Sequence, residues 1–136
     1  MSAASFQVDD AIAVAEFRAA LRQFLRRSER VARQSGLTPQ RYLLLLMIKG
    51  APGGNEQSTV TELSERLQLA QSTVTELVRR AEEAGLIERA QSQVDARVAH
   101  LRLSAEGERR LALAFTGLAA ERAQLRDAFA HLDETI

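Results

Sequence analysis

The sequence predicts a mainly α-helical protein that contains one small β-hairpin. Three features of its 136 residues support this fold class. Apolar residues recur every three or four positions over most of the chain, the period changes to two after Gly85, and Gly and Pro gather in one loop, 49–57. The longest apolar run, residues 42–48, is shorter than the roughly 18 residues that a membrane span needs. We therefore expect a globular protein that does not enter a membrane.

The composition narrows the classes of function. With 46% hydrophobic and 26% charged residues the chain is typical of a globular protein. It has no cysteine, which excludes disulfides and cysteine–zinc sites, and its two histidines argue against a histidine-based metal site. The N-terminus has no signal-peptide pattern, so we expect a cytoplasmic protein. There is no Gly-rich phosphate loop, paired histidine–carboxylate motif or Gly-x-Ser-x-Gly, so we predict no catalytic residue, cofactor or metal.

Two helices are predicted before the Gly/Pro loop. The first runs from Asp9 to about Gln34, with one largely apolar face, and would be roughly 39 Å long. A helix of that length needs a partner beside it. Its arginines give residues 1–50 a net charge of +4, and we interpret them as a solvated face. Thr38 as N-cap and Pro39 at the first helical position begin the second helix, which is apolar nearly all round and therefore predicted to be central.

The hexapeptide Ser-Thr-Val-Thr-Glu-Leu occurs twice, at 58–63 and at 72–77, with two different predicted roles. In the first copy Thr59 and Glu62 form a capping box that begins a short helix. The second copy lies within a helix whose apolar stripe faces the core and whose hydroxyls face outwards. Gly85 then ends this helix. The repeat therefore indicates a helix-turn-helix rather than a repeated structural unit.

A hairpin and a last helix follow. Residues 86–91 and 98–103 alternate as strands, and a polar segment joins them. Ser104 then caps one final helix. In that helix the residues that recur at steps of four and three are Leu111, Phe115, Leu118, Arg122, Leu125, Phe129 and Leu132.

This order of elements is the layout of a winged helix-turn-helix flanked by long helices, and the sequence resembles the MarR family, named for multiple-antibiotic-resistance regulators. The resemblance is carried by LTPQRYLLL, TVTELSERLQLAQSTVTELVRRAEEAGLIER, SQVDARV and LRLSAEGERRL. It implies an N-terminal dimerisation helix (1–36), a winged DNA-binding domain (37–103) and a C-terminal dimerisation helix (104–136). Within the winged domain, it implies a helix-turn-helix at 59–84 and a wing at 86–103.

The resemblance implies a homodimeric transcriptional regulator that reads a pseudo-palindromic operator in double-stranded DNA. It favours a repressor, released by a small and frequently aromatic or phenolic effector bound between the dimerisation helices and the winged domain. Tyr42, Phe17 and Phe24 lie near that region, although each is also a candidate core residue. Relatives usually continue into another helix, so we expect either a short dimer interface or a truncated chain. The predicted interface residues are Phe17, Leu21, Leu118, Leu125, Phe129 and Leu132.

The second helix of the helix-turn-helix is the predicted DNA-recognition helix. Ser72, Thr75 and Arg79 suit the major groove, where arginine can fork onto guanine. Glu76 has two interpretations: it accepts from a cytosine amino group, or it holds the neighbouring arginines by i+3 and i+4 pairing. The full set of predicted contacts comprises Gln71, Ser72, Thr73, Thr75, Glu76, Arg79 and Arg80, of which Gln71, Thr73 and Arg80 suit phosphates.

The wing supplies three further candidates. By resemblance, Arg97 enters the minor groove and Asp95 orients it, whereas the alternative is an ordinary turn aspartate with a surface ion pair worth under about 1 kcal/mol. Arg89 on the opposite strand is a candidate backbone contact. Residues 58–103 carry a net charge of −1, which predicts modest phosphate-driven affinity. This leaves open an alternative function, a winged-helix protein-interaction module without DNA binding.

Overall fold

The computed structural model describes residues 7–91 and 97–135, and within them the elements follow the predicted order. The protein is mainly helical with a small antiparallel hairpin, as predicted. The elements are α1 (Val8–Gln34), α2 (Pro39–Lys49), α3 (Val60–Leu67), α4 (Gln71–Glu83), β1 (Ile87–Gln91), β2 (Ala99–Leu103), α5 (Ala105–Thr116) and α6 (Ala119–Thr135).

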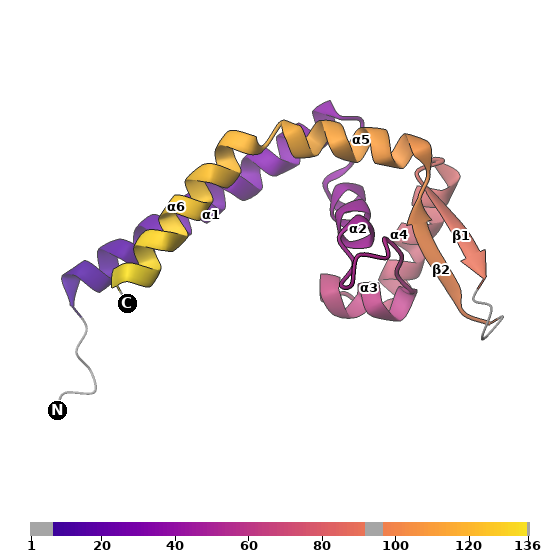
Figure 1. Ribbon diagram of the computed structural model, residues 1–136, viewed down its shortest axis with the longest axis horizontal. Helices are drawn as coiled ribbons and strands as arrows, with labels where there is room; N and C mark the ends of the chain where they lie inside the picture. Colours follow the sequence, from indigo (N-terminus) through magenta and orange to yellow (C-terminus); the bar gives the residue numbers. More distant parts are fainter. Residues whose placement is uncertain (1–6, 92–96, 136) are drawn as a thin grey trace.

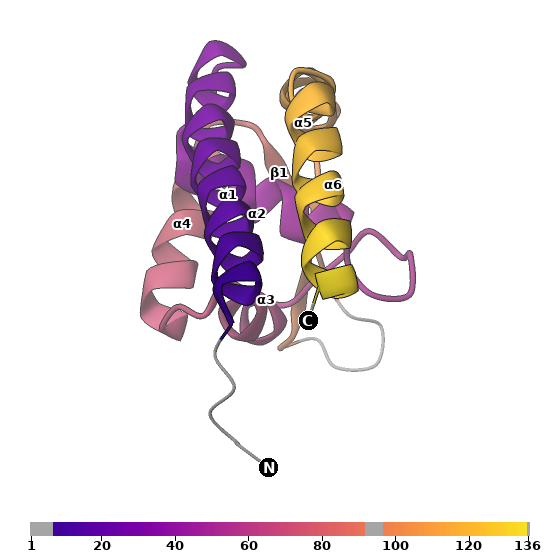
Figure 2. The same ribbon diagram turned by 90° about the vertical axis from the view of Figure 1, so that its left-hand side faces the viewer.

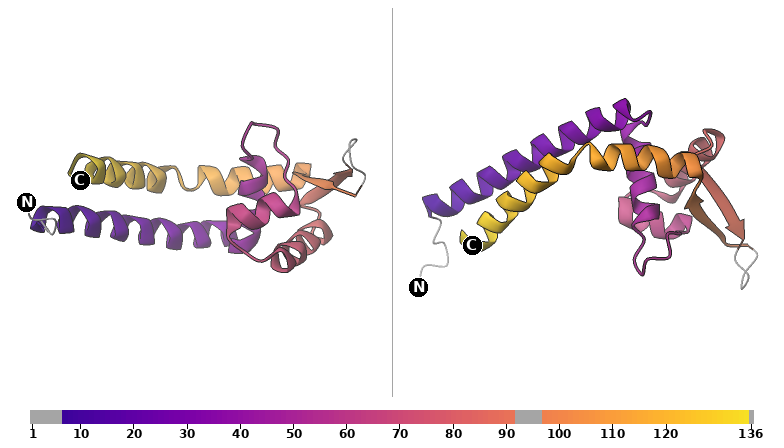
Figure 3. Two further views of the ribbon diagram at one scale, coloured as in Figure 1. Left: turned by 90° about the horizontal axis from the view of Figure 1, so that it is seen from below. Right: turned by 45° about the horizontal axis from the view of Figure 1, so that its top comes forward.

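The molecule is elongated, with its two parts at opposite ends. Helices α1 and α6 run side by side away from the remainder of the chain, and α2, α3, α4 and the hairpin gather at the other end (Figure 1). The views in Figures 2 and 3 show the same pairing of α1 with α6. Helix α5 connects the hairpin to this pair. The shape therefore separates a winged region, residues 37–103, from a two-helix arm.

Helix α2 is the centre of the winged region. Leu44, Leu45 and Ile48 are fully buried, and they belong to one continuous core with Val74 of α4 and Leu101 of β2. This burial confirms the prediction that the helix is central. Because all of these side chains are apolar, the core stabilises the winged region mainly through the hydrophobic effect.

The predicted helix caps are present. The Thr38 hydroxyl accepts from the Arg41 N–H at 3.1 Å. The capping box is complete, because Thr59 accepts from the Glu62 N–H at 3.2 Å and the Glu62 carboxylate accepts from the Thr59 N–H at 2.8 Å. Gln68 ends α3 in the left-handed conformation, with φ 57°, where a glycine would carry less strain.

The wing pairs with a third backbone segment that the sequence pattern did not predict. Strands β1 and β2 pair antiparallel, with Ile87 opposite Leu103. Ser58, which is buried, forms an additional bridge to Leu101, with backbone N···O distances of 3.1 and 2.8 Å. The residue before the capping box therefore ties the start of α3 to the wing.

The single C-terminal helix predicted over 104–136 is wrong, because two helices occupy this region. Ser104 does cap α5, accepting from the Gly107 N–H at 3.1 Å, but α5 ends at Gly117 and α6 begins at Ala119. Leu118 between them is fully buried. Burying this residue at the bend directs α6 along α1. Residues 105–135 therefore form two helices that pack in different parts of the fold.

No helix within the described ranges is both long and apolar enough to cross a membrane.

We predict that Gly107→Ala destabilises the fold. A Cβ at this position would lie 2.1 Å from the Leu86 carbonyl oxygen, and that oxygen accepts from the Ser104 N–H at 2.9 Å. The expected loss is about 1–3 kcal/mol in the free energy of unfolding, as for other overpacked sites, measured by urea denaturation. Ala112→Gly, at an exposed position of the same helix, is the control for helix propensity and should cost about 1 kcal/mol. A Gly107→Ala variant as stable as the wild type would contradict the close packing.

Candidate nucleic-acid interface

Helix α4 is held against the core by one face and exposes the other. Val74, Leu77, Val78 and Ala81 are buried, as their spacing predicted. The residues predicted to contact DNA lie outside this stripe. Gln71, Ser72, Thr73, Thr75, Arg79 and Arg80 are exposed and Glu76 is partly exposed. Ala70 makes no side-chain cap at the start of α4, so the N–H groups of the first turn receive no side-chain acceptor from this position.

Glu76 holds both arginines of α4. Its carboxylate accepts from Arg79 Nε at 2.9 Å and Nη2 at 2.6 Å, and from Arg80 Nε at 3.0 Å. These hydrogen bonds, chiefly the one from Arg79, lower the pKa of Glu76 to about 2. The prediction of i+3 and i+4 pairing is therefore confirmed. It does not exclude a role for the same carboxylate at a base edge.

Arg79 has a second carboxylate partner that the sequence analysis missed. Its Nη1 also donates to Glu83, one turn further along α4. The spacing of four residues was a readable signal for this pair. With Glu76 and Glu83 on either side, the pKa of Arg79 is raised further, so this guanidinium is a fixed positive charge between two carboxylates.

Arg89, which was predicted to contact the DNA backbone, forms an ion pair within the chain. Its Nε lies 3.0 and 2.9 Å from the two oxygens of Glu82, and its Nη2 lies 2.9 Å from one of them. The pair joins β1 to the last turn of α4. Sequence reasoning missed Glu82, because the partners are seven residues apart across the turn at Gly85 and no local periodicity brings them together. Arg89 therefore links the wing to α4.

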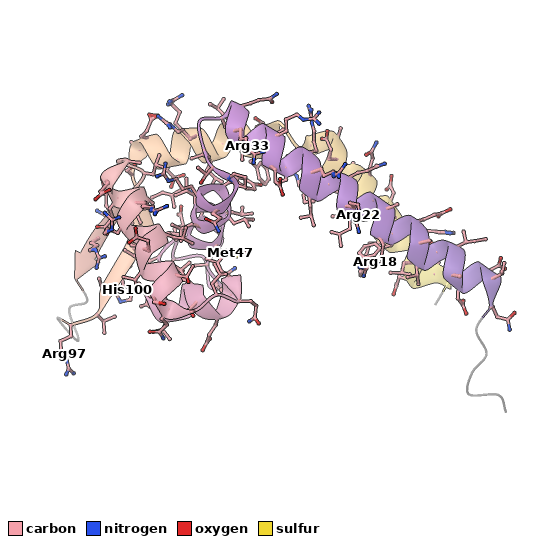
Figure 4. The ribbon with its side chains drawn as sticks, turned by 180° about the vertical axis from the view of Figure 1, so that it is seen from behind. Arg18, Arg22, Arg33, Met47, Arg97 and His100 are labelled. Carbon is pink, nitrogen blue, oxygen red and sulfur yellow. The ribbon has the colours of Figure 1, made fainter. Side chains whose placement is uncertain are left out.

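The wing tip is only partly described. Arg97 is exposed and projects from the end of the hairpin away from the other elements (Figure 4). The predicted partner Asp95 lies outside the described residues. His100 on β2 is partly buried.

The candidate dimer residues fall into two groups. Leu118 is fully buried in the core of its own chain, so its side chain offers no surface to a second subunit, which corrects that prediction. Phe17 of α1 and Phe129 of α6 instead pack edge to face with their ring centroids 6.0 Å apart, and 57% of Phe129 remains exposed. Leu21, Leu125 and Leu132 are partly exposed.

Two of the hollows beside α1 are lined by the aromatic residues considered for an effector site. A pocket of about 140 Å³ between α1 and α2 is lined by Leu25, Ser28, Glu29, Pro39, Tyr42 and Leu43. A more open hollow between α1 and α6 is lined by Phe17, Phe24, Arg122, Leu125, Arg126 and Phe129. The three aromatic residues considered for an effector site are therefore divided, with Tyr42 in the first hollow and the two phenylalanines in the second.

The described residues contain no group of three or more His, Asp or Glu side chains placed to hold a metal ion.

We predict that Glu76 titrates far below the usual pKa of a glutamate. Because its folded-state pKa is lowered to about 2 from 4.5, the pairing stabilises the fold above about pH 4.5 and is lost as the pH falls towards 2. Carbon-13 NMR of the side-chain carboxyl should show a midpoint near 2 in the wild type and a clearly higher one in Arg79→Gln. Arg26→Gln removes the same charge from α1 and should leave the midpoint unchanged. Equal midpoints in wild type and Arg79→Gln would contradict this network.

Comparison with known proteins identifies a family whose sequence profile matches part of the chain. The sequence profile described as MarR family matches residues 35–98, from the end of α1 into the wing. No curated protein matches the chain.

Solved structures match over a longer range. The YusO protein of Bacillus subtilis is 24% identical with a TM-score of 0.64, covering 88% of this chain and 83% of that one. A mutant of E. coli MarR in complex with operator DNA is 18% identical with a TM-score of 0.69, covering 86% and 85%. A mutant of S. aureus MepR bound to an oligodeoxyribonucleotide is 19% identical with a TM-score of 0.66, covering 82% and 79%. These coverages exceed the profile match, so the shared fold includes parts of the flanking helices.

Proposed function

We propose that this chain, whose winged region matches the profile of the MarR family of winged helix-turn-helix transcription regulators, is a member of that family and a homodimeric, sequence-specific DNA-binding repressor. The observation that carries the proposal is the exposed outer face of α4, with Ser72, Thr75 and Arg79. The exposed Arg97 lies on the hairpin, and Figure 4 shows it projecting away from the other elements. Structures with the same fold bind operator DNA or an oligodeoxyribonucleotide. We place the protein in the cytoplasm, where its DNA is accessible.

In this proposal α4 enters the major groove and the wing follows the neighbouring minor groove. The hydroxyls of Ser72 and Thr75 can bond base edges or phosphates, and Arg79 can fork onto guanine. Arg97 carries a positive charge to the end of the hairpin, and a narrow A·T-rich minor groove attracts such a charge. Asp95 would orient Arg97.

A dimer is supported by apolar surface on the two-helix arm. Val8, Ile12 and Val14 of α1 and Phe129 of α6 are exposed, and α5 adds Leu113 and Phe115. Exposed apolar groups concentrated on one part of a molecule mark a protein–protein contact. Two copies joined through their arms would present two winged regions, as a pseudo-palindromic operator requires.

An effector is supported by the position of the pocket between α1 and α2. A ligand there would touch both the arm and the winged region, with Leu25 and Tyr42 as apolar walls and Ser28 as a polar group. Small aromatic or phenolic molecules suit this combination. If such a ligand binds best to a dimer whose half-site spacing mismatches the operator, it shifts the population away from DNA.

The near-neutral outer face of α4 favours one alternative function. Helix α4 contains two arginines and three glutamates, and each arginine is paired with a carboxylate. A winged-helix module that binds another protein instead of DNA would tolerate such a face, whereas phosphate binding requires available positive charge.

The first prediction from the proposed function concerns DNA binding. In a fluorescence-anisotropy titration with the duplex upstream of its own gene, the protein should bind tightly, and affinity should fall as salt rises. Arg97→Ala should weaken binding roughly 5- to 150-fold, the range for one lost specific arginine contact. Arg26→Ala removes the same charge from α1 and should change binding little. If the wild type binds this duplex and a scrambled one equally weakly, and Arg97→Ala changes neither affinity, the protein-interaction module becomes the better interpretation.

The second concerns the dimer. Phe129→Asp should raise the dimer dissociation constant at least about 30-fold, because a charge would replace an aromatic anchor worth about 2 kcal/mol or more in the interface. Sedimentation velocity at several concentrations measures this, with circular dichroism confirming that the helices persist. Gln124→Asp places a charge at an exposed polar position of α6 and is the matched control. A monomeric wild type would overturn the dimer.

A further inference from the structure

The outer face of α4 carries a row of hydroxyl, carboxylate and guanidinium groups. Ser72, Glu76, Arg79 and Glu83 follow at steps of four, three and four, so they lie in one line along the helix, opposite the buried stripe. Within this line Arg79 donates to a carboxylate on each side. Glu76 is thus a fixed acceptor between a hydroxyl and a guanidinium, in the middle of the face offered to a partner.

This arrangement is poorly suited to phosphates. An arginine that binds phosphate must supply unpaired positive charge, whereas Arg79 and Arg80 are both already hydrogen-bonded to Glu76. A carboxylate beside a phosphate is also repelled by it. The Glu76–Arg79 pair therefore opposes sequence-independent binding, and its contribution to affinity has to come from base edges.

One base pair offers the complementary groups. In the major groove guanine presents two acceptors, N7 and O6, and cytosine presents one donor, its N4 amino group. Arg79 supplies the donors and Glu76 the acceptor, held side by side at 2.6 and 2.9 Å. Since guanine O6 and cytosine N4 are hydrogen-bonded to one another in the pair, their outward-facing groups are also adjacent.

We propose that Glu76 and Arg79 form one base-reading unit that selects a G·C pair in each half-site, with the carboxylate accepting from cytosine N4 and the guanidinium donating to guanine. This inference rests on the proposed function and names a specificity determinant within it. At an A·T pair, with adenine in the place of guanine, Arg79 would keep only the N7 acceptor and the carboxylate would face the O4 acceptor and the methyl group of thymine. At a T·A pair the adenine amino group could satisfy Glu76, but Arg79 would face thymine and lose one of its two acceptors. The unit therefore discriminates through its carboxylate as well as through its arginine.

Glu83 provides a matched control for this idea. It carries the same charge, lies on the same helix and pairs with the same arginine, but it is the last residue of α4. In helix-turn-helix complexes the N-terminal part of the recognition helix contacts the bases, so Glu83 should lie beyond them. Both Glu76→Gln and Glu83→Gln free Arg79 from one carboxylate, and only the first removes an acceptor from the base-reading position.

The test is a selection from duplexes containing 20 random base pairs (roughly two helical turns), carried out with the full chain as wild type, Glu76→Gln and Glu83→Gln. We expect the wild type and Glu83→Gln to select the same motif, with a conserved G·C pair in each half-site. Glu76→Gln should select a motif in which that position is relaxed. Titrations should show that changing this pair to A·T weakens the wild type roughly 5- to 150-fold and Glu76→Gln several-fold less.

The outcomes separate the two proposals. If Glu76→Gln selects the wild-type motif with the same discrimination at every position, the base-reading unit is overturned while the regulator stands. If Glu76→Gln and Glu83→Gln both relax the same position, the effect comes from freeing Arg79 and the role of the Glu76 carboxylate is likewise overturned. If the folded, dimeric wild type enriches no motif at all, the proposed function itself fails, and this inference fails with it.

Discussion

The burial of α2 at the centre of the winged region is the constraint from which the other positions follow. Leu44, Leu45 and Ile48 reach zero exposure because α1, α3, α4, α5 and β2 all pack against this helix. Every covering element is amphipathic, so turning its apolar side towards α2 turns its polar side outwards. The outer face of α4 is therefore a consequence of core packing. A protein that reads DNA through a rigid helix needs this, because the geometry of base contacts tolerates little movement of the side chains.

Electrostatics adds a second layer to the same surface. The charges of α4 and the wing are organised in pairs: Glu76 and Glu83 hold Arg79, and Glu82 holds Arg89. Exposed pairs of this kind contribute little to stability. If α4 binds DNA as proposed, their larger effect would be on the orientation of the arginines and on nonspecific attraction to phosphates. Paired arginines are weaker ligands for phosphate than free ones. A surface built in this way would therefore have a lower sequence-independent affinity for DNA and would depend more on contacts to particular bases.

The two-helix arm follows a different principle from the winged region. The pair of α1 and α6 leaves apolar side chains exposed along its length, including Val8, Ile12 and Phe129. A single layer of two helices has no third element to cover these groups. The arm is therefore suited to association, while the winged region is complete within one chain. The pocket between α1 and α2 lies where the two parts meet, the place at which a bound molecule would alter their relative position.

Local chemistry in the sequence determined the elements, their order and most of their ends. Thr38, the box of Thr59 and Glu62, Ser104 and Gly85 each act within a few residues, and the hydrophobic period distinguished helix from strand without knowledge of distant contacts. The exposed face of α4 and the pairing of Glu76 with its arginines followed from helical spacing alone. The tertiary structure decided what depends on residues far apart: the bend at Gly117 that buries Leu118 and divides the C-terminal helix, the bridge from Ser58 to Leu101, and the pairing of Arg89 with Glu82. The heptad pattern continued through residues 111–132 because both halves have an apolar face, but the halves pack against different partners. Periodicity records that a face is buried, and only the assembled fold determines against what.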